Sequence, residues 1–397
     1  MERQIKLCIV SPLYHPSVGG PGRQAVAFAE KYFSGGGSVV VFCRKMLGLP
    51  AYNYNPNIKV YRIRSFYPQI YNLEEISFKN LLISLSFSIG LIIFFLRKKK
   101  EYDIVHFYGA GLPLVLSVLL LKIMGKKIVA TVLATNLGNE AGSFKNRYFP
   151  LGFLMTNILK MVDIFIAMSE DIEEALLNDG FKKDSIIKIS NWVDTNKFYP
   201  IETADKRSLR NKLGLKESIT VFFVGRLVYR KGVDLLIKAW EDVVVVHPSY
   251  TLLIAGIGEE QEKLKNLCRD LGIEGNVLFL GHINNVEEYF KVIDLFVLPS
   301  LLEGMPNTLL EAMACRLPVI GTKIGGVVDI IKDRGNGLIV TSGNVEELKD
   351  AILTLLENKY LSEAIAEKAY NTIREDYTID KVLDKYVLLY KKVLGAI

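Results

Sequence analysis

Hydrophobic residues recur along the chain in short Val- and Ile-rich runs, and most runs are followed by a longer segment with helical spacing. In the first half the runs stand at 5–10, 38–43, 58–63, 103–107, 127–132 and 163–167. Such alternation predicts parallel strands joined by helical crossovers. We therefore expect the first half to form a doubly wound α/β domain, also described as Rossmann-like.

The alternation stops in the polar stretch SNWVDTNKFYPIETADKRSLRNKLGL, residues 190–215, and then begins again. This stretch has one proline and no sustained strand, so it predicts a linker that leads into a small helix. New strand runs follow in ITVFFVG, TLLIAG, VLFLG, DLFVLPS, PVIG and GLIV. The pattern predicts two Rossmann-like domains, 1–197 and 198–375, and a last helix, 376–397, that packs on the first domain.

The composition fits this organisation. The chain has 397 residues, half of them hydrophobic, which is enough for two domains with a core each. Its four cysteines are far apart and lack the spacing of a zinc site, so we expect reduced, buried thiols in a cytoplasmic protein. They are Cys8, Cys43, Cys268 and Cys315. The first residues lead directly into a strand, so we expect no signal peptide.

The net charge of +6 conceals an asymmetry between the two halves. Residues 1–160 contain 20 Lys and Arg against 7 Asp and Glu, so the rest of the chain is net acidic. Nucleic acid is a poor partner for the basic half, because no interleaving of basic and aromatic residues accompanies the charge.

The basic character is strongest in LLISLSFSIGLIIFFLRKKK, residues 81–100, where an apolar run ends in four consecutive cations. The run is shorter than the ~20 residues that span a bilayer. Two readings remain open. One is a mostly buried helix with a solvated basic end. The other is a helix that rests on anionic lipid, where each cation contributes about 1 kcal/mol, and it predicts a peripheral protein at the inner face of the membrane.

Ligands of open parallel sheets bind beyond the carboxyl ends of the strands. The first such loop, SPLYHPSVGGPGRQ, places Gly19, Gly20 and Gly22 before a helix that begins near Arg23. Glycines let a backbone approach a ligand, and a helix N-terminus favours an anion. The loop is not GxGxxG, which counts against a nicotinamide enzyme. A tight turn without a ligand is the alternative.

The corresponding loop of the second domain is FVGRLVYRKGVDLL, in which Arg226 and Lys231 follow a strand. Arginine grips phosphate oxygens with two N–H groups, and lysine supplies a mobile point charge. Together they suit a diphosphate, although two solvated surface cations would give the same pattern.

The stretch SLLEGMPNTLLEAMACRLPVIG, residues 300–321, holds Glu303 and Glu311 on either side of a Gly, Pro and Asn cluster. In one continuous helix the two carboxylates would be roughly 80° apart, on no common face. Gly304 and Pro306 disfavour such a helix, so we place Glu303 in a loop that leaves the strand.

We expect the helix to begin at about Asn307, a good N-cap residue, with Glu311 one turn inside it. The backbone N–H groups of Met305 to Thr308 would then face the same space as Glu303. That arrangement predicts an anion site with two carboxylates suited to sugar hydroxyls. A capping role, worth only ~0.3 to 1 kcal/mol, is the alternative and needs just one of the two.

These residues resemble the donor-binding half of glycosyltransferase family 4, notably GRLVYRKGVDLL and LFVLPSLLEGMPNTLLEAMACRLPVIGTKIGGVVDII with its Glu, seven residues, Glu spacing. SNWVDTNKFYP resembles the interdomain segment of that family, and YHPSVGGPGRQ resembles its N-terminal glycine loop. The resemblance covers nearly the whole chain and is strongest from about 190 to 345. It implies the two-domain GT-B fold, with both domains facing a cleft, and transfer with retention of configuration.

The resemblance implies that Arg226 and Lys231 hold the diphosphate of the donor, that Glu303 reaches the transferred sugar and that Glu311 holds the ribose hydroxyls. It assigns the remaining donor contacts to Gly304, Met305, Pro306, Asn307 and Thr308, to Gly19 and Gly20 from the other domain, and to Ile283 beside the base. We take Glu303, Arg226 and Lys231 as the catalytic residues.

No Asp-x-Asp pair stands in a suitable loop, which agrees with a family that works without a metal ion. Arg226, Lys231 and the helix terminus would then stabilise the leaving diphosphate. We therefore expect no metal and no cofactor.

The sequence departs from the family pattern at two places. Many relatives have a histidine where this chain has Leu133 or its neighbours. His106 is our candidate to replace it on the acceptor side, although a lone histidine at a strand end is commonly structural. Trp192 stands where glycine is usual, and it either reshapes the linker or stacks on a ligand.

The sequence thus predicts a retaining glycosyltransferase that moves a hexose from a UDP- or GDP-sugar to a lipid-linked or glycan acceptor. A sugar-nucleotide epimerase, a nicotinamide oxidoreductase and a non-catalytic sugar-nucleotide binder remain as alternatives.

Overall fold

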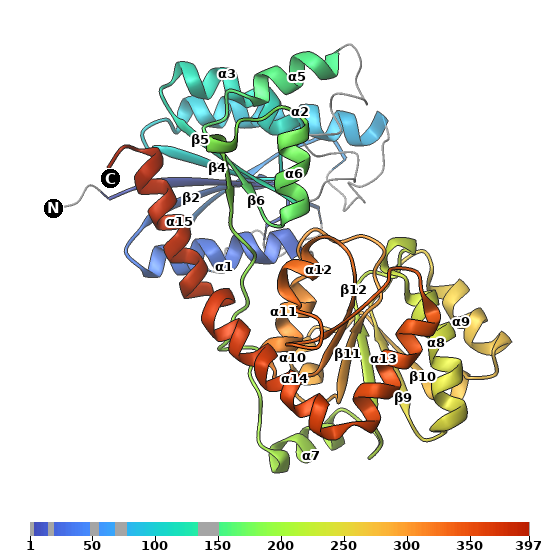
Figure 1. Cartoon of the computed structure of the whole chain (residues 1–397). Helices are drawn as coiled ribbons and strands as arrows, with labels where there is room; N and C mark the ends of the chain where they lie inside the picture. Colours follow the sequence, from blue (N-terminus) through green and yellow to red (C-terminus); the bar gives the residue numbers. More distant parts are fainter. Residues whose placement is uncertain (1–3, 15–19, 48–54, 68–77, 134–150, 397) are drawn as a thin grey trace. The chain divides into compact units, whose positions relative to one another are not determined.

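The computed structural model describes residues 4–14, 20–47, 55–67, 78–133 and 151–396, and the chain divides into two compact units (Figure 1). The first unit comprises Met1–Asn191 with Val382–Ile397, and the second comprises Trp192–Lys381. Each contains one parallel sheet with helices between the strands. The sequence placed the two boundaries at 197/198 and 375/376, whereas the division falls at 191/192 and 381/382.

The sheet of the first unit has seven parallel strands in the order β3-β2-β1-β4-β5-β6-β7. Its strands are β1 Lys6–Ser11, β2 Ser38–Arg44, β3 Lys59–Ile63, β4 Ile104–Tyr108, β5 Lys127–Val132, β6 Ile164–Ala167 and β7 Ile186–Lys188. Its helices are α1 Gly20–Ser34, α2 Phe78–Arg97, α3 Leu112–Ile123, α5 Leu151–Leu159, α6 Glu170–Asn178, the 3-10 turn η2 Lys183–Ser185, and α15 Ile379–Val393, which belongs to this unit from Val382.

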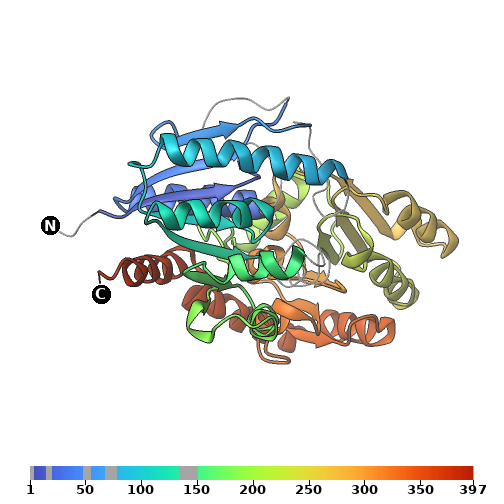
Figure 2. The same ribbon diagram turned by 90° about the horizontal axis from the view of Figure 1, so that it is seen from above.

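The central strands of this sheet are buried on both faces, as their continuous Val and Ile runs require. Helices α2, α3 and α5 lie together on one side of the sheet, and α1 lies on the other (Figures 1 and 2). Helix α15 packs beside α1, where the rings of Tyr386 and Phe28 are 5.0 Å apart. The predicted return of the C-terminal helix to the first domain is therefore present.

The sheet of the second unit has six parallel strands in the order β10-β9-β8-β11-β12-β13. They are β8 Thr220–Val224, β9 Thr251–Ala255, β10 Val277–Gly281, β11 Leu295–Leu298, β12 Val319–Thr322 and β13 Leu338–Val340. The helical elements are α7 Thr203–Lys212, η3 Tyr229–Lys231, α8 Val233–Val246, α9 Gln261–Asp270, η4 Glu274–Asn276, α10 Val286–Phe290, α11 Asn307–Ala314, α12 Gly325–Ile330, α13 Val345–Glu357, α14 Lys359–Thr372 and the π-helical turn η5 Ile373–Tyr377.

The polar stretch that the sequence identified as a linker packs on the second unit. The Val193 N–H donates to the Tyr377 carbonyl oxygen at 2.9 Å. In α7, Arg210 is buried and donates to the Val292 carbonyl oxygen at 2.8 Å. Trp192 is only 3% exposed. Its burial favours a structural role over stacking on a ligand.

Helix α2 differs from the expectation of a mostly buried helix. Only Ile83, Phe87, Ser88, Leu91 and Phe95 are buried along its 20 residues. Among the described residues it is the one helix that is long and apolar enough to cross a bilayer. Its most apolar stretch of 18 residues has a mean hydropathy of 2.0, yet just 28% of that stretch is buried. The periodic pattern predicted the helix correctly, but it did not reveal how much of the helix the sheet would cover.

Candidate active site

The strand order of the second sheet defines where a ligand would bind. From β8 the chain moves to β9 and β10 on one side, and β11, β12 and β13 lie on the other. Strands β8 and β11 are neighbours, so their carboxyl ends form the topological switch point at which ligands of open parallel sheets bind. Both loops that the sequence singled out, 225–232 and 299–306, begin at this switch point.

The loop after β8 is pressed against the end of β11. Gly232 has a left-handed backbone with φ +61°, and a Cβ there would lie 2.2 Å from the carbonyl oxygen of Pro299. Only glycine fits such a position. The Leu301 N–H also donates to the Arg230 carbonyl oxygen at 2.8 Å. These contacts fix the turn that presents Lys231.

Lys231 and Glu303 are in direct contact at this switch point, with the ammonium Nζ donating to the carboxylate Oε1. Their side chains are only 15% and 8% exposed, respectively. The Ser300 hydroxyl donates to the same carboxylate oxygen at 2.8 Å. Ser300 is itself fully buried, and its carbonyl oxygen accepts a hydrogen bond from the Thr322 hydroxyl. The Glu303 carboxylate is therefore held from two sides by donors on neighbouring loops.

Helix α11 begins next to this carboxylate. Asn307 is its first residue and Pro306 occupies the N-cap position, so the expectation that Asn307 caps the helix was wrong. The Pro306 carbonyl oxygen accepts from the Leu309 N–H at 3.2 Å, and the missing N–H of proline costs the helix nothing because it would lie ahead of the first turn. Glu311 is in the second turn, as expected, and is only 8% exposed.

The loop between Glu303 and α11 is anchored by the start of α12. The Gly326 N–H donates to the Gly304 carbonyl oxygen at 3.1 Å. A Cβ at Gly326 would approach that oxygen to 2.1 Å, so the two backbones are in contact and only glycine fits at position 326.

The other candidates of the second unit follow the carboxyl ends of its strands. Arg226 is exposed directly after Gly225, and Ile283 is half-buried in the connection from β10 to α10. Met305 and Pro306 are buried, whereas Gly304, Asn307 and Thr308 are half-buried. In the first unit, Gly20 is the first residue of α1, and Gly19 lies outside the described residues.

Three residues of this site were missed from the sequence: Ser300, Thr322 and Gly326. Each stands at or after the carboxyl end of a strand, which is where ligands of parallel sheets bind. The glycine pair in TKIGGVVDII, directly after β12, was a signal for the close approach at Gly326.

His106, the acceptor-side candidate, lies in the interior of the first unit on β4. Its Nδ1 is 2.7 Å from the Tyr390 hydroxyl, and its Nε2 is 2.8 Å from the Thr131 hydroxyl. Burial lowers the pKa of the imidazole from 6.5 to about 3, so the ring is neutral. Since Tyr390 belongs to α15, His106 connects the sheet to the C-terminal helix, and this environment favours the structural reading.

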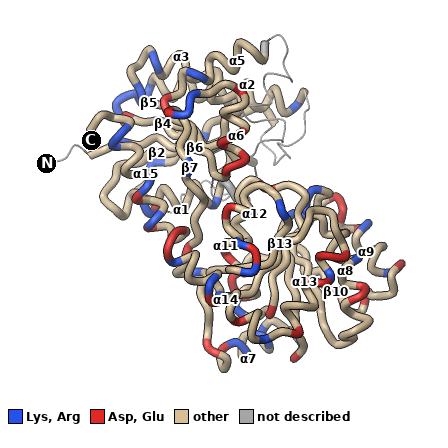
Figure 3. The backbone as a smooth tube through the Cα atoms, in the orientation of Figure 1, with Lys and Arg blue, Asp and Glu red and all other residues tan. Residues whose placement is uncertain are grey.

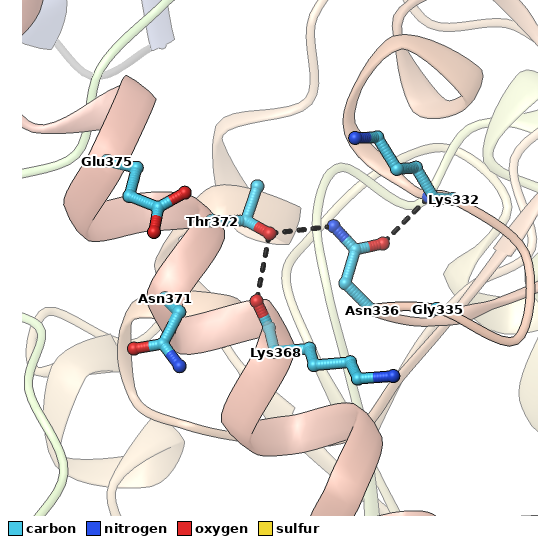
Figure 4. Close-up of a pocket in the computed structure, with 7 residues that line it drawn as sticks. All are labelled: Lys332, Gly335, Asn336, Lys368, Asn371, Thr372 and Glu375. Atoms are coloured by element: carbon cyan, nitrogen blue, oxygen red, sulfur yellow. Dashed lines mark hydrogen bonds between the residues drawn. The ribbon is translucent and has the colours of Figure 1, made fainter.

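A shallow hollow of about 260 Å³ lies elsewhere in the second unit (Figure 4). It is lined by Lys332, Gly335, Asn336, Lys368, Asn371, Thr372 and Glu375. The Asn336 amide donates to the Thr372 hydroxyl at 3.0 Å and accepts from the Lys332 N–H at 2.7 Å. The segment 332–337 precedes β13, so it stands at the amino edge of the sheet. The hollow is therefore at the opposite edge of the sheet from the candidate site.

No three His, Cys, Asp or Glu side chains converge on a possible metal position in the part of the chain that the structure describes. The loop after β8 carries three cations, Arg226, Arg230 and Lys231. The absence of a metal requirement stays a prediction.

Comparisons with known proteins agree with the fold and the motifs. Residues 18–197 match the family model described as Glycosyltransferase Family 4, and residues 205–372 match Glycosyl transferases group 1. An uncharacterized glycosyltransferase from Haemophilus influenzae is 33% identical over 56% of this chain and 60% of its own length. The UDP-Gal:alpha-D-GlcNAc-diphosphoundecaprenol alpha-1,3-galactosyltransferase from Escherichia coli is 30% identical over 74% of this chain and 76% of its own length.

Among solved structures, HepE from Anabaena in complex with UDP-glucose is similar with a TM-score of 0.78 and 20% identity, over 99% of this chain and 100% of that one. At this identity the likeness shows the fold alone. The two parallel sheets are those of a GT-B glycosyltransferase. The chain belongs to glycosyltransferase family 4. It is accordingly a transferase enzyme.

Proposed function

We propose that this enzyme transfers a hexose from a UDP- or GDP-sugar to a lipid-linked or glycan acceptor, with retention of configuration and without a metal ion. The observation behind the proposal is the contact of Lys231 with Glu303 at the switch point of the second sheet, beside the start of α11. Two similar proteins support the choice of donor and acceptor class: HepE is seen with UDP-glucose, and the E. coli relative is named for a lipid-linked acceptor.

The donor's diphosphate would lie between the β8 loop and the N-terminus of α11. Arg226 and Lys231 supply positive charge, and the first N–H groups of α11 supply donors that have no partner within the helix. Negative charge grows on the diphosphate as the sugar leaves. These fixed groups would stabilise that charge and would fill the role of a metal ion.

The Glu303 carboxylate would accept a hydrogen bond from a hydroxyl group of the transferred hexose. Its Oε1 already accepts from Lys231 and Ser300, so the carboxylate has a fixed orientation before any sugar arrives. The Glu311 carboxylate, mostly buried in α11, would accept hydrogen bonds from the ribose hydroxyls. In this proposal Lys231 contacts both Glu303 and the phosphate, and thereby sets the distance between them.

The proposed chemistry needs no carboxylate nucleophile. The acceptor hydroxyl oxygen forms a bond to C1 of the hexose while the bond from C1 to the diphosphate oxygen breaks. The acceptor proton passes to the departing phosphate oxygen, and both events occur on one face of the sugar. The products are the glycoside and a nucleoside diphosphate, with the configuration at C1 unchanged.

Incubation with radiolabelled UDP-glucose or GDP-mannose and a bacterial lipid extract tests the proposal. We expect label in the lipid or glycan fraction, and Glu303→Ala should abolish it. Glu363→Ala is the matched control, because Glu363 is 69% exposed on α14 of the same unit. NMR of the product should show the anomeric configuration of the donor, and EDTA should leave the rate unchanged.

The other functions would appear in the same experiment. An epimerase would release an isomeric sugar nucleotide without any acceptor, and a non-catalytic binder would leave the donor intact. Full activity of Glu303→Ala would show that the site is elsewhere. We further propose that the reaction takes place at the cytoplasmic face of a membrane, where a lipid-linked acceptor would be presented.

A further inference from the structure

The helix layer on one side of the first sheet has an outer surface of apolar side chains. Figure 2 shows α2, α3 and α5 side by side, and each helix contributes exposed residues. The exposed fractions range from 38% for Leu116 to 85% for Ile123. We call this surface the apolar face; it consists of Phe78, Ile89, Ile93, Leu96, Leu116, Leu119, Ile123, Phe153, Leu154 and Met161.

The spacing shows that the exposed residues of α2 and those of α3 each form a stripe. Ile89, Ile93 and Leu96 are four and three residues apart, so they lie on one side of α2. Leu116, Leu119 and Ile123 are three and four residues apart and lie on one side of α3. A helix at a water-exposed surface normally has polar residues on its outer side. Here α2 has charges only near its two ends, and α3 has one, Lys122, in its last turn.

The inner side of α2 is fixed to the sheet. The ring of Phe95 is 5.5 Å from that of Phe42 on β2. A Cβ at Gly90 would lie 2.2 Å from the side chain of Ile63 on β3, so helix and strand are in close contact. Because α2 is packed in this way, its outer stripe can meet a partner without leaving the sheet, although its length would also suit a membrane span.

Positive charge gathers at one end of the apolar face. Between Phe78 and Val132 there are eight Lys and Arg against two Asp and Glu; seven of the cations lie at this end, and Asp163 pairs with two of them, Lys122 and Lys127. Both α2 and α3 cross from the carboxyl to the amino edge of the sheet, so Arg97–Lys100 and Lys122–Lys127 belong to the same edge. The charges can be followed along the backbone in Figure 3.

We propose that the apolar face docks on the surface of an anionic lipid bilayer, with the cations at the ends of α2 and α3 against the headgroups. The side chains would enter the interface as those of an interfacial helix do, about 5–10 Å deep. Lys99 and Lys100, both exposed, would contact anionic lipid. This inference rests on the proposed function to the extent that a lipid-linked acceptor gives the enzyme a reason to meet a membrane.

Charge distinguishes this partner from a second copy of the chain. A symmetric contact in which the helices of the two copies run parallel would bring two basic edges together, and like charges oppose that arrangement. An anionic bilayer offers apolar depth and opposite charge at once. The bilayer therefore fits both properties of the surface.

Flotation of the full-length protein with phosphatidylcholine vesicles, with and without 30% phosphatidylglycerol, tests the proposal. We expect the protein to float with the anionic vesicles at low salt, and less at high salt. Ile93→Asp combined with Leu119→Asp should reduce the bound fraction at least about 10-fold. Lys99→Glu combined with Lys100→Glu should reduce it at least about 5-fold, since one cation near such a surface is worth roughly that factor.

Val245→Asp is the matched control, because Val245 is 77% exposed on α8 in the second unit. It should float like the unmodified protein. All variants should keep the thermal-shift response to UDP or GDP, so loss of flotation and loss of the donor site can be told apart. Equal flotation of the Asp variant would overturn the proposal. A dimer that the same variant converts to a monomer would instead assign the apolar face to a second copy.

Discussion

Gly326→Ala tests whether the backbone contact beneath Glu303 sets the geometry of the candidate site. Gly326, near the start of α12, donates its N–H to the Gly304 carbonyl oxygen at 3.1 Å. The added Cβ would lie 2.1 Å from that oxygen and 3.1 Å from Cα of Met305. These atoms belong to the loop that connects Glu303 to α11, and both sides of the contact are backbone. No flexible side chain is available to absorb the overlap.

The size of the displacement follows from the same distances. Real Cβ atoms keep at least 3.0 Å from such an oxygen, so the loop or α12 must move by about 0.9 Å. A misplacement of about 1 Å at a reacting centre costs roughly 100-fold in rate. Overpacking of this kind costs about 1 to 3 kcal/mol of stability. We therefore expect kcat to fall by about 100-fold while the protein still folds.

The assay is steady-state release of nucleoside diphosphate with a saturating acceptor, together with thermal unfolding of each variant. Gly275→Ala serves as the control, since a Cβ there meets no atom within 4 Å and Gly275 lies in the short turn before β10. It should keep full activity and a stability within about 1 kcal/mol of the unmodified protein. The reasoning is refuted if Gly326→Ala keeps both its kcat and its melting temperature.

Three further predictions concern other parts of the molecule. Ser300→Ala removes one of the two donors to Glu303, and we expect kcat to fall about 10-fold, with recovery in Ser300→Thr; an unchanged kcat in the Ala variant would exclude a positioning role. His106 is neutral in the fold and protonates near 6.5 when unfolded, so stability should be lost as pH falls below 6.5, by up to about 1.4 kcal/mol per pH unit; an equal pH dependence of urea unfolding in His106→Gln would contradict this. The four buried thiols should react with a disulfide reagent only after denaturation, because burial raises their pKa values; fast labelling of the folded protein would disprove it. They are Cys8, Cys43, Cys268 and Cys315.

Much of the fold could be predicted because buried parallel strands have a clear pattern. Strands such as β1 and β11 are short apolar runs covered on both faces, and glycine or polar turns bound them. Strand β7 was missed because its three residues are too few to show a period. The unit boundary also differed, since the polar stretch after Asn191 packs through Val193 and Arg210 rather than remaining a separate linker.

The outward side of α2 could not be inferred from its sequence. A helix that is apolar on nearly all sides has no polar stripe to show which side faces away from the sheet. Its neighbours decide this: α3, which follows after β4, and the strands β2 and β3 of the sheet. The sequence therefore left two readings of α2 open, and only the exposed fractions show how much of it remains uncovered.

The candidate site was predicted by residue type but not by contact. Lys231 and Glu303, 72 residues apart in the chain, were singled out separately, and their pairing depends on β8 lying next to β11. Serine is common at strand ends, so nothing in the sequence pattern indicated the hydrogen bond from Ser300 to Glu303. The capping error at Asn307 arose because proline took the preceding position.

Isothermal titration of UDP and GDP into the unmodified protein, Lys231→Ala and Arg226→Ala tests the central claim most directly, namely that the switch point of the second sheet holds the donor's diphosphate. Lys238→Ala, on the exposed surface of α8, is the control. We predict that one nucleotide binds and that each of the first two variants weakens it at least about 10-fold, whereas the control does not. Unchanged affinity in both variants would contradict the account.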